Sequence, residues 1–148
     1  MKKIKTVLTA IVMLLSISSF ATDPENVSPV VKAAFQNDFA KASVVNWDKT
    51  DDFYFASFLL NGESVNAAYT ESGELIGTSR NMSASLMPLS ISVAIADKYN
   101  GYQVGDAVTE LTYASVTRYY VTVSNDKQTV RLKCLTNGDI EVERKTKK

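Results

Sequence analysis

The sequence contains no histidine and only one cysteine, and these two absences exclude several kinds of site. Without histidine the chain cannot build a serine–histidine or cysteine–histidine nucleophile pair, an imidazole zinc site or an imidazole base that titrates near neutral pH. Cys134 has no second cysteine for an internal disulfide, so stability has to come from packing. No glycine-rich phosphate loop is present. We therefore expect no enzymatic activity, no metal site and no cofactor.

The long apolar run of the chain lies at its N-terminus. Lysines precede the apolar residues 7–17, and Ser19-Phe20-Ala21 places small residues at both specificity positions of a signal-peptidase site. The run is too short to span a bilayer. We expect residues 1–21 to be a signal peptide and the mature chain to begin at Thr22, where the absence of cysteine argues against a lipoprotein. This predicts a periplasmic or extracellular protein.

Charge argues against nucleic acid as a partner, and hydropathy argues against a membrane. The whole chain has 16 basic and 16 acidic residues. Loss of the signal-peptide lysines would leave the mature chain with an acidic excess, whereas nucleic-acid binding needs a concentrated positive field. No second apolar run would hold the mature protein in a membrane. We expect neither a nucleic acid nor a membrane to be its partner.

Three carboxylates lie close together in the sequence, at Asp48, Asp51 and Asp52. They could form a catalytic pair or a calcium loop. However, exposed turn carboxylates have no desolvation to raise a pKa, and the mid-loop glycine and closing glutamate of a calcium loop are absent. We favour a solvated hairpin turn. For Cys134 we favour a small, buried apolar role on the inner face of the sheet over a redox or nucleophilic one.

The strongest local signal is Asn61-Gly62, which lies between two strand-like runs. Asn-Gly in a two-residue loop favours a type I′ hairpin turn, because both central residues need positive φ. Pairing Leu60 with Glu63 then fixes the register. The resulting apolar face places Tyr54, Ala56 and Phe58 opposite Tyr69, Ala67 and Val65. On the flanking strand we expect Trp47 opposite Tyr54.

Hydrophobic periodicity predicts two helices and eight strands. The first helix, at 29–39 after the N-cap Ser28, turns Val31, Ala34, Phe35 and Phe39 inward. The second, at 88–99, ends at Asn100-Gly101 and is expected to turn Leu89, Val93, Ala96 and Ile95 inward. The expected strands are residues 44–48, 53–60, 63–69, 75–80, 102–112, 115–123, 128–135 and 140–144.

The order helix-then-four-strands occurs twice, which indicates an internal repeat. Tyr54 corresponds to Tyr119, and Gly73 to Gly138, at a constant offset of 65 residues. Neither half has enough apolar residues to form a stable hydrophobic core on its own. We predict an α+β fold in which the two tandem units form one antiparallel sheet of about eight strands, with both helices on one face.

A family resemblance supports this arrangement. The motifs are V-x-W at 45–47, Y-x-A-x-F at 54–58, Asn-Gly, A-x-Y at 67–69, a glycine turn and the Leu-x-Pro entry at 86–88. In this order they resemble the PepSY-like, beta-lactamase-inhibitor-like family of bacterial envelope proteins. The resemblance implies the tandem fold of beta-lactamase-inhibitor protein, whose open sheet face binds proteins, and it implies no catalytic residue. We expect one PepSY-like domain over 22–148, with units at 28–81 and 88–145. Residues 113–120 lack the Y-x-A-x-F match, so a shared two-site binding mode does not follow.

The candidate binding site is the sheet face away from the helices. Aromatic and arginine anchors within a polar surround are typical of protein-binding patches. We expect Arg131 directly opposite Tyr120 and stacked on it. Cross-strand aromatics that only stabilise the sheet are the alternative. The candidate site residues are Phe53, Phe55 and Arg80 in the first unit and Arg118, Tyr120 and Arg131 in the second.

Two functions are compatible with these features. The first is a secreted, non-catalytic protein-binding module of the bacterial cell envelope, of which an enzyme inhibitor is one form, with another envelope or secreted protein as its partner. The alternative is a periplasmic small-ligand or peptide-binding protein whose pocket lies between helices and sheet, near Trp47. An exposed edge strand could also pair with a second copy of the chain. Exposed Phe53, Phe55 and Tyr120 would favour the first function, and an apolar cavity beside Trp47 would favour the second.

Overall fold

The computed structural model describes residues 26–50 and 52–148. The predicted signal peptide, residues 1–21, and Asp51 lie outside the described residues. Two compact units meet in sequence between Arg80 and Asn81. That the mature chain is one domain stays a prediction. No helix within the described part of the chain is both long and apolar enough to cross a membrane.

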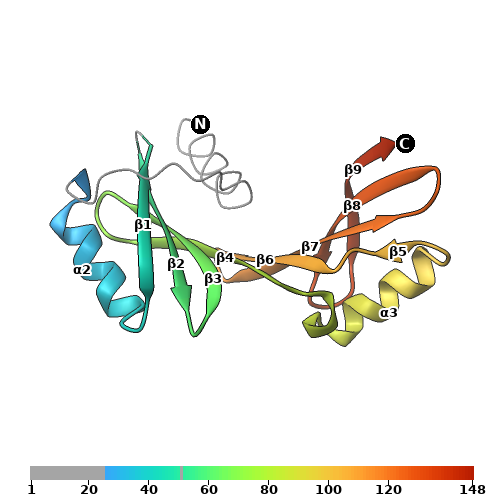
Figure 1. Cartoon of the computed structure of the whole chain (residues 1–148), viewed down its shortest axis with the longest axis horizontal. Helices are drawn as coiled ribbons and strands as arrows, with labels where there is room; N and C mark the ends of the chain where they lie inside the picture. The colour runs from blue at the N-terminus through green and yellow to red at the C-terminus, as the bar shows by residue number, and fades with distance from the viewer. Residues whose placement is uncertain (1–25, 51) are drawn as a thin grey trace. The chain divides into compact units, whose positions relative to one another are not determined.

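The predicted α+β fold is confirmed, with a helix followed by antiparallel strands in each unit (Figure 1). In the first unit, α2 (Pro29–Asp38) precedes β1 (Ser43–Lys49), β2 (Phe53–Leu60), β3 (Glu63–Thr70) and β4 (Leu75–Ser83). The 3-10 turn η2 (Ala84–Leu86) then leads to α3 (Leu89–Lys98), β5 (Gln103–Val104), β6 (Ala107–Tyr113), β7 (Val116–Ser124), β8 (Gln128–Leu135) and β9 (Ile140–Lys147). The strand order is β1-β2-β3-β4-β6-β7-β8-β9, and β5 pairs with β7. That both helices share one face stays a prediction.

Helix α2 begins and packs as its sequence predicts. The Ser28 hydroxyl accepts a hydrogen bond from the Val31 backbone N–H, which satisfies one of the free donors of the first turn. Val31 and Phe35 are buried in the core of the first unit. The Phe35 ring contacts Trp47 edge-to-face, with 5.1 Å between the ring centroids. The helix therefore covers one face of β1–β3 with aromatic packing.

The β2–β3 hairpin has the predicted register from Leu60 and Glu63 to Tyr54 and Tyr69. The predicted pairing of β1 with β2 was wrong by two residues, because Trp47 lies opposite Ala56 rather than Tyr54. A shift of two residues keeps every side chain on its face, since side chains alternate with a period of two. Trp47 is therefore buried on the helix-covered face, as predicted.

Helix α3 turns only part of the predicted stripe toward its sheet. Ile91 and Ile95 are buried, whereas Leu89 and Val93 are 77% and 52% exposed. The prediction was right for Ile95 and wrong for Leu89 and Val93, because α3 is apolar on both sides and two stripes satisfy the helical spacing equally well. Buried residues of β6–β8, including Cys134, complete the core of the second unit. The predicted apolar role of Cys134 on the inner face is confirmed.

A glycine turn supports the helix of each unit. Gly73 has φ +83°, and a Cβ there would lie 3.3 Å from the backbone oxygen of Val30. At the equivalent position Gly138 has φ +92°, and a Cβ would lie 3.1 Å from the backbone oxygen of Ser90. Both the positive φ and the close approach of the helix require glycine. The predicted repeat therefore preserves the contact between turn and helix.

Candidate functional site

The two phenylalanines of the candidate site are buried, which contradicts the prediction that they are exposed. Phe53 and Phe55 are 7% and 5% exposed, and they belong to β2 positions that alternate away from the core of α2. The run from Phe53 to Ala56 is buried on both faces of the strand. A near-continuous apolar sequence is typical of a strand that is covered on both sides. The prediction of one open face for this run was therefore wrong.

Arg80 does not join the phenylalanines, because a register shift in β4 turns it to the other face. Between Tyr69 and Ala68 the pairing with β4 slips by one residue, which leaves Ile76 unpaired. Beyond this bulge Arg80 lies opposite Val65, a residue of the core of α2. Its Nη1 binds Glu63 Oε2 at 2.9 Å. A one-residue slip reverses the faces of all following residues, so the prediction for Arg80 was wrong.

The predicted stacking between Arg131 and Tyr120 is present in the second unit. The guanidinium carbon of Arg131 lies 5.4 Å from the centre of the Tyr120 ring. The residue directly opposite Tyr120 is Lys133, and Arg131 lies opposite Thr122, so the contact is diagonal. The turn lies one residue later than predicted, which shifts the register by two: the Asn125 N–H donates to the Gln128 carbonyl, and the Asn125 side-chain oxygen accepts the backbone N–H groups of Lys127 and Gln128.

Tyr120 is 7% exposed, so the prediction of an exposed ring is wrong here too. Its neighbours on the same face are long, charged side chains whose aliphatic stems can cover apolar surface. Burial raises the pKa of the Tyr120 hydroxyl, and the nearby Glu143 carboxylate acts in the same direction. Lys133, Arg118 and Arg131 partly oppose this rise in the pKa. The hydroxyl therefore stays protonated at neutral pH and can donate a hydrogen bond.

Ion pairs hold two of the three cations around Tyr120. Arg131 Nε lies 2.8 Å from Glu143 Oε2. Lys133 pairs with Glu141 from the neighbouring strand β9. Arg118 donates instead to the backbone oxygen of Val116, at 3.4 Å. We call the face of β7–β9 that carries these residues the outer face of the second unit. The group itself, the Tyr120 cluster, consists of Arg118, Tyr120, Arg131, Lys133, Glu141 and Glu143.

Arg144, which the sequence analysis placed at the end of the last expected strand, also lies on this face. It is paired directly opposite Arg131, and directly paired residues project to the same side of a sheet. Arg144 is exposed. A register shift in β9 between the partners of Arg131 and Leu132 places it there. The sequence carries no signal for this bulge, so the position of Arg144 could not have been predicted.

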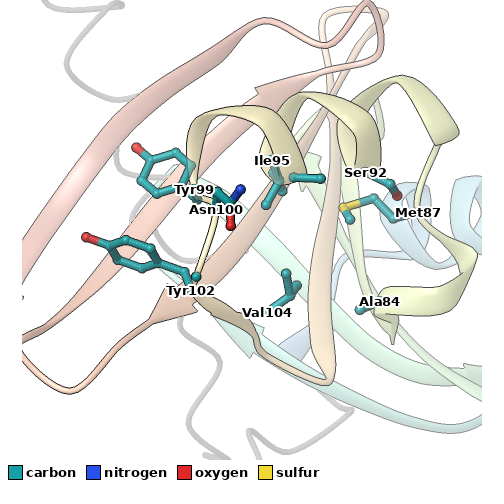
Figure 2. Close-up of a pocket in the computed structure, with 10 residues that line it drawn as sticks. Ala84, Met87, Ser92, Ile95, Tyr99, Asn100, Tyr102 and Val104 are labelled. Carbon is teal, nitrogen blue, oxygen red and sulfur yellow. The ribbon is translucent and has the colours of Figure 1, made fainter.

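A shallow groove lies between α3 and β5 in the second unit (Figure 2). It has a volume of about 440 Å³. Tyr99 and Tyr102 form one end, with their ring centroids 5.4 Å apart in an edge-to-face contact. Ile95 and Met87 supply apolar walls, and Ser92 adds a hydroxyl. Such a groove could hold an apolar side chain or a small ligand.

The first unit has a similar groove beside Trp47, of about 490 Å³. Phe39, Val45 and Trp47 line it, and Lys32 and Gln36 provide the polar groups. The helix residues that line it correspond to those that line the second groove, because α3 repeats α2 at an offset of 60 residues. The groove lies beside Trp47, where the sequence analysis placed the pocket of its alternative function, and it is therefore a candidate ligand site.

Other titratable groups in the two cores serve the fold. The hydroxyl of the fully buried Tyr69 donates to Asp38 Oδ2 at 2.9 Å. Burial raises the pKa of the Cys134 thiol to about 11, with a smaller opposing effect of Lys98. A protonated, buried thiol is a poor nucleophile. Among residues 26–50 and 52–148, no three histidine, cysteine or carboxylate side chains gather closely enough to hold a metal ion.

Comparison with solved structures identifies proteins with this fold. A BLIP-like protein from Bacteroides fragilis has a TM-score of 0.66 and 20% identity, over 81% of this chain and 85% of its own. A DUF2874 family protein from Bacteroides ovatus has a TM-score of 0.68 and 20% identity, over 86% and 89% of the two chains.

A third structure, of a Bacteroides eggerthii protein proposed to be periplasmic, has a TM-score of 0.66 and 18% identity, over 87% and 90% of the two chains. No family model and no curated protein matches the sequence. The predicted resemblance is confirmed at the level of structure, and the chain has the fold of these BLIP-like and DUF2874 proteins of Bacteroides.

Proposed function

We propose that this protein is a non-catalytic protein-binding module of the bacterial cell envelope, with enzyme inhibition as one form of that role. The observation that supports the proposal is the stack of Arg131 on Tyr120, held in place by Glu143 on the outer face of the second unit. Part of the Arg131 side chain stays exposed beside the buried Tyr120. Arginine contributes much of the binding energy of many protein interfaces, and a side chain that is already held loses little entropy on binding.

The periplasm or the extracellular space is the proposed location. The basic and apolar residues at the N-terminus support it, because they have the order of a secretory signal. The Bacteroides eggerthii protein with the same fold is itself proposed to be periplasmic. Cell fractionation of the tagged full-length chain tests this location, and retention of the protein in the cytoplasm would contradict it.

The binding proposal is tested with a matched pair of arginine variants. The purified protein is immobilised and exposed to envelope extract from its source organism, and captured proteins are identified by mass spectrometry. The candidate partner is then purified and titrated by calorimetry. Arg131→Ala should weaken binding at least tenfold. Arg80→Ala serves as the control, since Arg80 is also ion-paired but lies on the helix-covered face of its own unit.

Two results would contradict the proposed interface. If Arg131→Ala and Arg80→Ala weaken binding equally, the outer face of the second unit is not the interface. If no purified candidate forms a complex of defined stoichiometry, the protein-binding function itself fails. Circular dichroism of both variants verifies that each one is folded.

Binding of a small ligand or peptide is the second candidate function, and the groove beside Trp47 favours it. Trp47 is the sole tryptophan, so its fluorescence reports directly on an occupant. An apolar anionic dye such as anilinonaphthalene sulfonate would place its rings against Phe39 and its charge near Lys32. Ala42→Phe should fill the groove and abolish energy transfer from Trp47 to the dye. Transfer that persists in this variant would show that the dye binds elsewhere.

A further inference from the structure

The outer face of the second unit carries an excess of positive charge. Pairing between β7, β8 and β9 places four cationic side chains on it, and two carboxylates lie beside them. The local charge is therefore about +2, in a chain whose formal net charge is zero. The side chains that contribute are Arg118, Arg131, Lys133 and Arg144 on the positive side and Glu141 and Glu143 on the negative side.

The excess charge is located at two arginines. Glu143 and Glu141 are held by Arg131 and Lys133. Arg118 and Arg144 form no ion pair with any residue that the structure describes. A guanidinium presents several N–H donors in a plane and matches a carboxylate with two parallel hydrogen bonds. Each of these two arginines therefore has donors available for a carboxylate from another molecule.

The spacing of the two arginines suggests the shape of what they bind. Arg118 lies on β7 and Arg144 on β9, so two inter-strand steps of about 4.8 Å separate them across the sheet. Along the strands they are offset by the four residues between Leu135 and Arg131, or about 13 Å. The two backbones are then about 16 Å apart, the length of roughly five residues of an extended chain. Two carboxylates four to six residues apart in an extended segment would reach both arginines.

Tyr120 lies between these two positions and adds a neutral donor. Its hydroxyl makes no hydrogen bond to another residue in the described part of the chain, and it keeps its proton because burial and Glu143 raise its pKa. A hydroxyl of this kind can donate to a carboxylate or to a backbone carbonyl. The face therefore combines the guanidinium groups of two arginines with a tyrosine hydroxyl donor between them.

On the basis of the proposed function, we propose that the outer face of the second unit recognises an extended, acidic segment of a partner protein, with Arg118 and Arg144 as its two carboxylate anchors. An anionic membrane is the less favourable partner. Its phosphates form a continuous negative layer, which Glu141 and Glu143 between the two arginines would repel. Separate carboxylates on a peptide can lie beside the arginines and avoid the glutamates.

The probe for this proposal is a fluorescein-labelled ten-residue peptide of alternating glutamate and serine, with a glutamine–serine peptide of the same length as its neutral counterpart. Binding to the full mature chain is measured by fluorescence anisotropy at low ionic strength, where exposed charges are least screened. The acidic peptide should bind, its affinity should fall as salt is added, and the neutral peptide should bind at least tenfold more weakly.

Two double variants with the same change in net charge locate the site. Arg118→Gln with Arg144→Gln should weaken binding of the acidic peptide at least tenfold. Lys145→Gln with Lys147→Gln is the control, because these exposed lysines pair with Val130 and Gln128 and project to the other side of β9. In nitrogen-15 NMR spectra, the peptide should shift the side-chain Nε–H signals of Arg118 and Arg144.

Each contrary result has a clear meaning. Equal weakening by both double variants would show a response to net charge alone and would overturn the proposed site. Absence of binding by the acidic peptide would also overturn it, as would tighter binding to phosphatidylglycerol vesicles than to the peptide. If the partner identified by capture requires Arg131 but tolerates loss of Arg118 and Arg144, the acidic segment is disproved while the protein-binding function stands.

Discussion

Replacement of Tyr69 by phenylalanine should destabilise the protein at neutral pH but not at high pH. The ring is fully buried, and its hydroxyl donates to Asp38 Oδ2 at 2.9 Å. A hydrogen bond to a charged group contributes about 1.5 to 3 kcal/mol to folding. Because Asp38 is exposed, water can replace the lost donor, so we expect a loss near the lower end, about 1.5 kcal/mol.

The pH dependence follows from the raised pKa of Tyr69. Burial first, and then the Asp38 carboxylate, hold this pKa far above the usual tyrosine value. Above about pH 10 the unfolded chain loses the phenolic proton while the folded protein keeps it, so this contribution to stability is present below pH 10 and falls as pH rises. The loss is about 1.4 kcal/mol per pH unit and is absent from Tyr69→Phe. The two proteins should therefore be equally stable near pH 11.

Urea unfolding at a series of pH values from neutral to about 11 tests this reasoning. Trp47 belongs to the same core as Tyr69, so its fluorescence follows the unit in which the substitution lies. The control is Tyr113→Phe, because Tyr113 is half-buried and makes no hydrogen bond to another described residue. A difference between the Tyr69 variant and the original protein that stays constant over this whole pH range would refute the argument.

Three further predictions concern the fold. Gly73→Ala and Gly138→Ala should each lower the free energy of unfolding in urea by about 2 to 3 kcal/mol, because strain at positive φ adds to contact with a helix backbone. Gly62→Ala, at φ +85° in open space, should lower it by only about 1 kcal/mol. Equal losses of stability at all three sites would contradict the contact with the helix. Cys134 should not react with Ellman's reagent at pH 8 until the protein unfolds, because it is buried and its pKa is raised to about 11; rapid labelling of the native protein would disprove its burial. If the two units form one domain, Trp47 fluorescence and far-ultraviolet circular dichroism should give coincident unfolding transitions, and separate midpoints would show that the units unfold independently.

Local interactions account for what the sequence could predict. The Asn61-Gly62 turn determines the register of its hairpin through backbone geometry alone, and the structure has that register throughout. Ser28 determines the start of α2 in the same way. The errors at Trp47 and in the β7–β8 hairpin were shifts of two residues. They kept the faces correct, because the apolar pattern specifies a face and not a partner.

The remaining errors come from features that the local sequence does not specify. The exposure of Phe53 and Phe55 depends on what covers the second side of β2, and an apolar run fits either case. The orientation of α3 depended on a choice between two apolar stripes. Alignment with the first helix would have resolved it, since Val31 and Phe35 correspond to Ile91 and Ile95 at an offset of 60 residues. The stack of Arg131 on Tyr120 survived the error in register because a long side chain can reach its diagonal neighbour.

The unpaired Ile76 gives the first unit an unusual sensitivity to changes in length. Deletion of this one codon would remove the bulge, restore plain alternation along β4 and move Thr78 and Arg80 together to the opposite face of the sheet. Neither residue would have to mutate. Relatives that differ by one residue at this point could therefore display opposite sets of side chains from otherwise similar sequences, and an alignment that ignores the gap would compare groups that point in opposite directions.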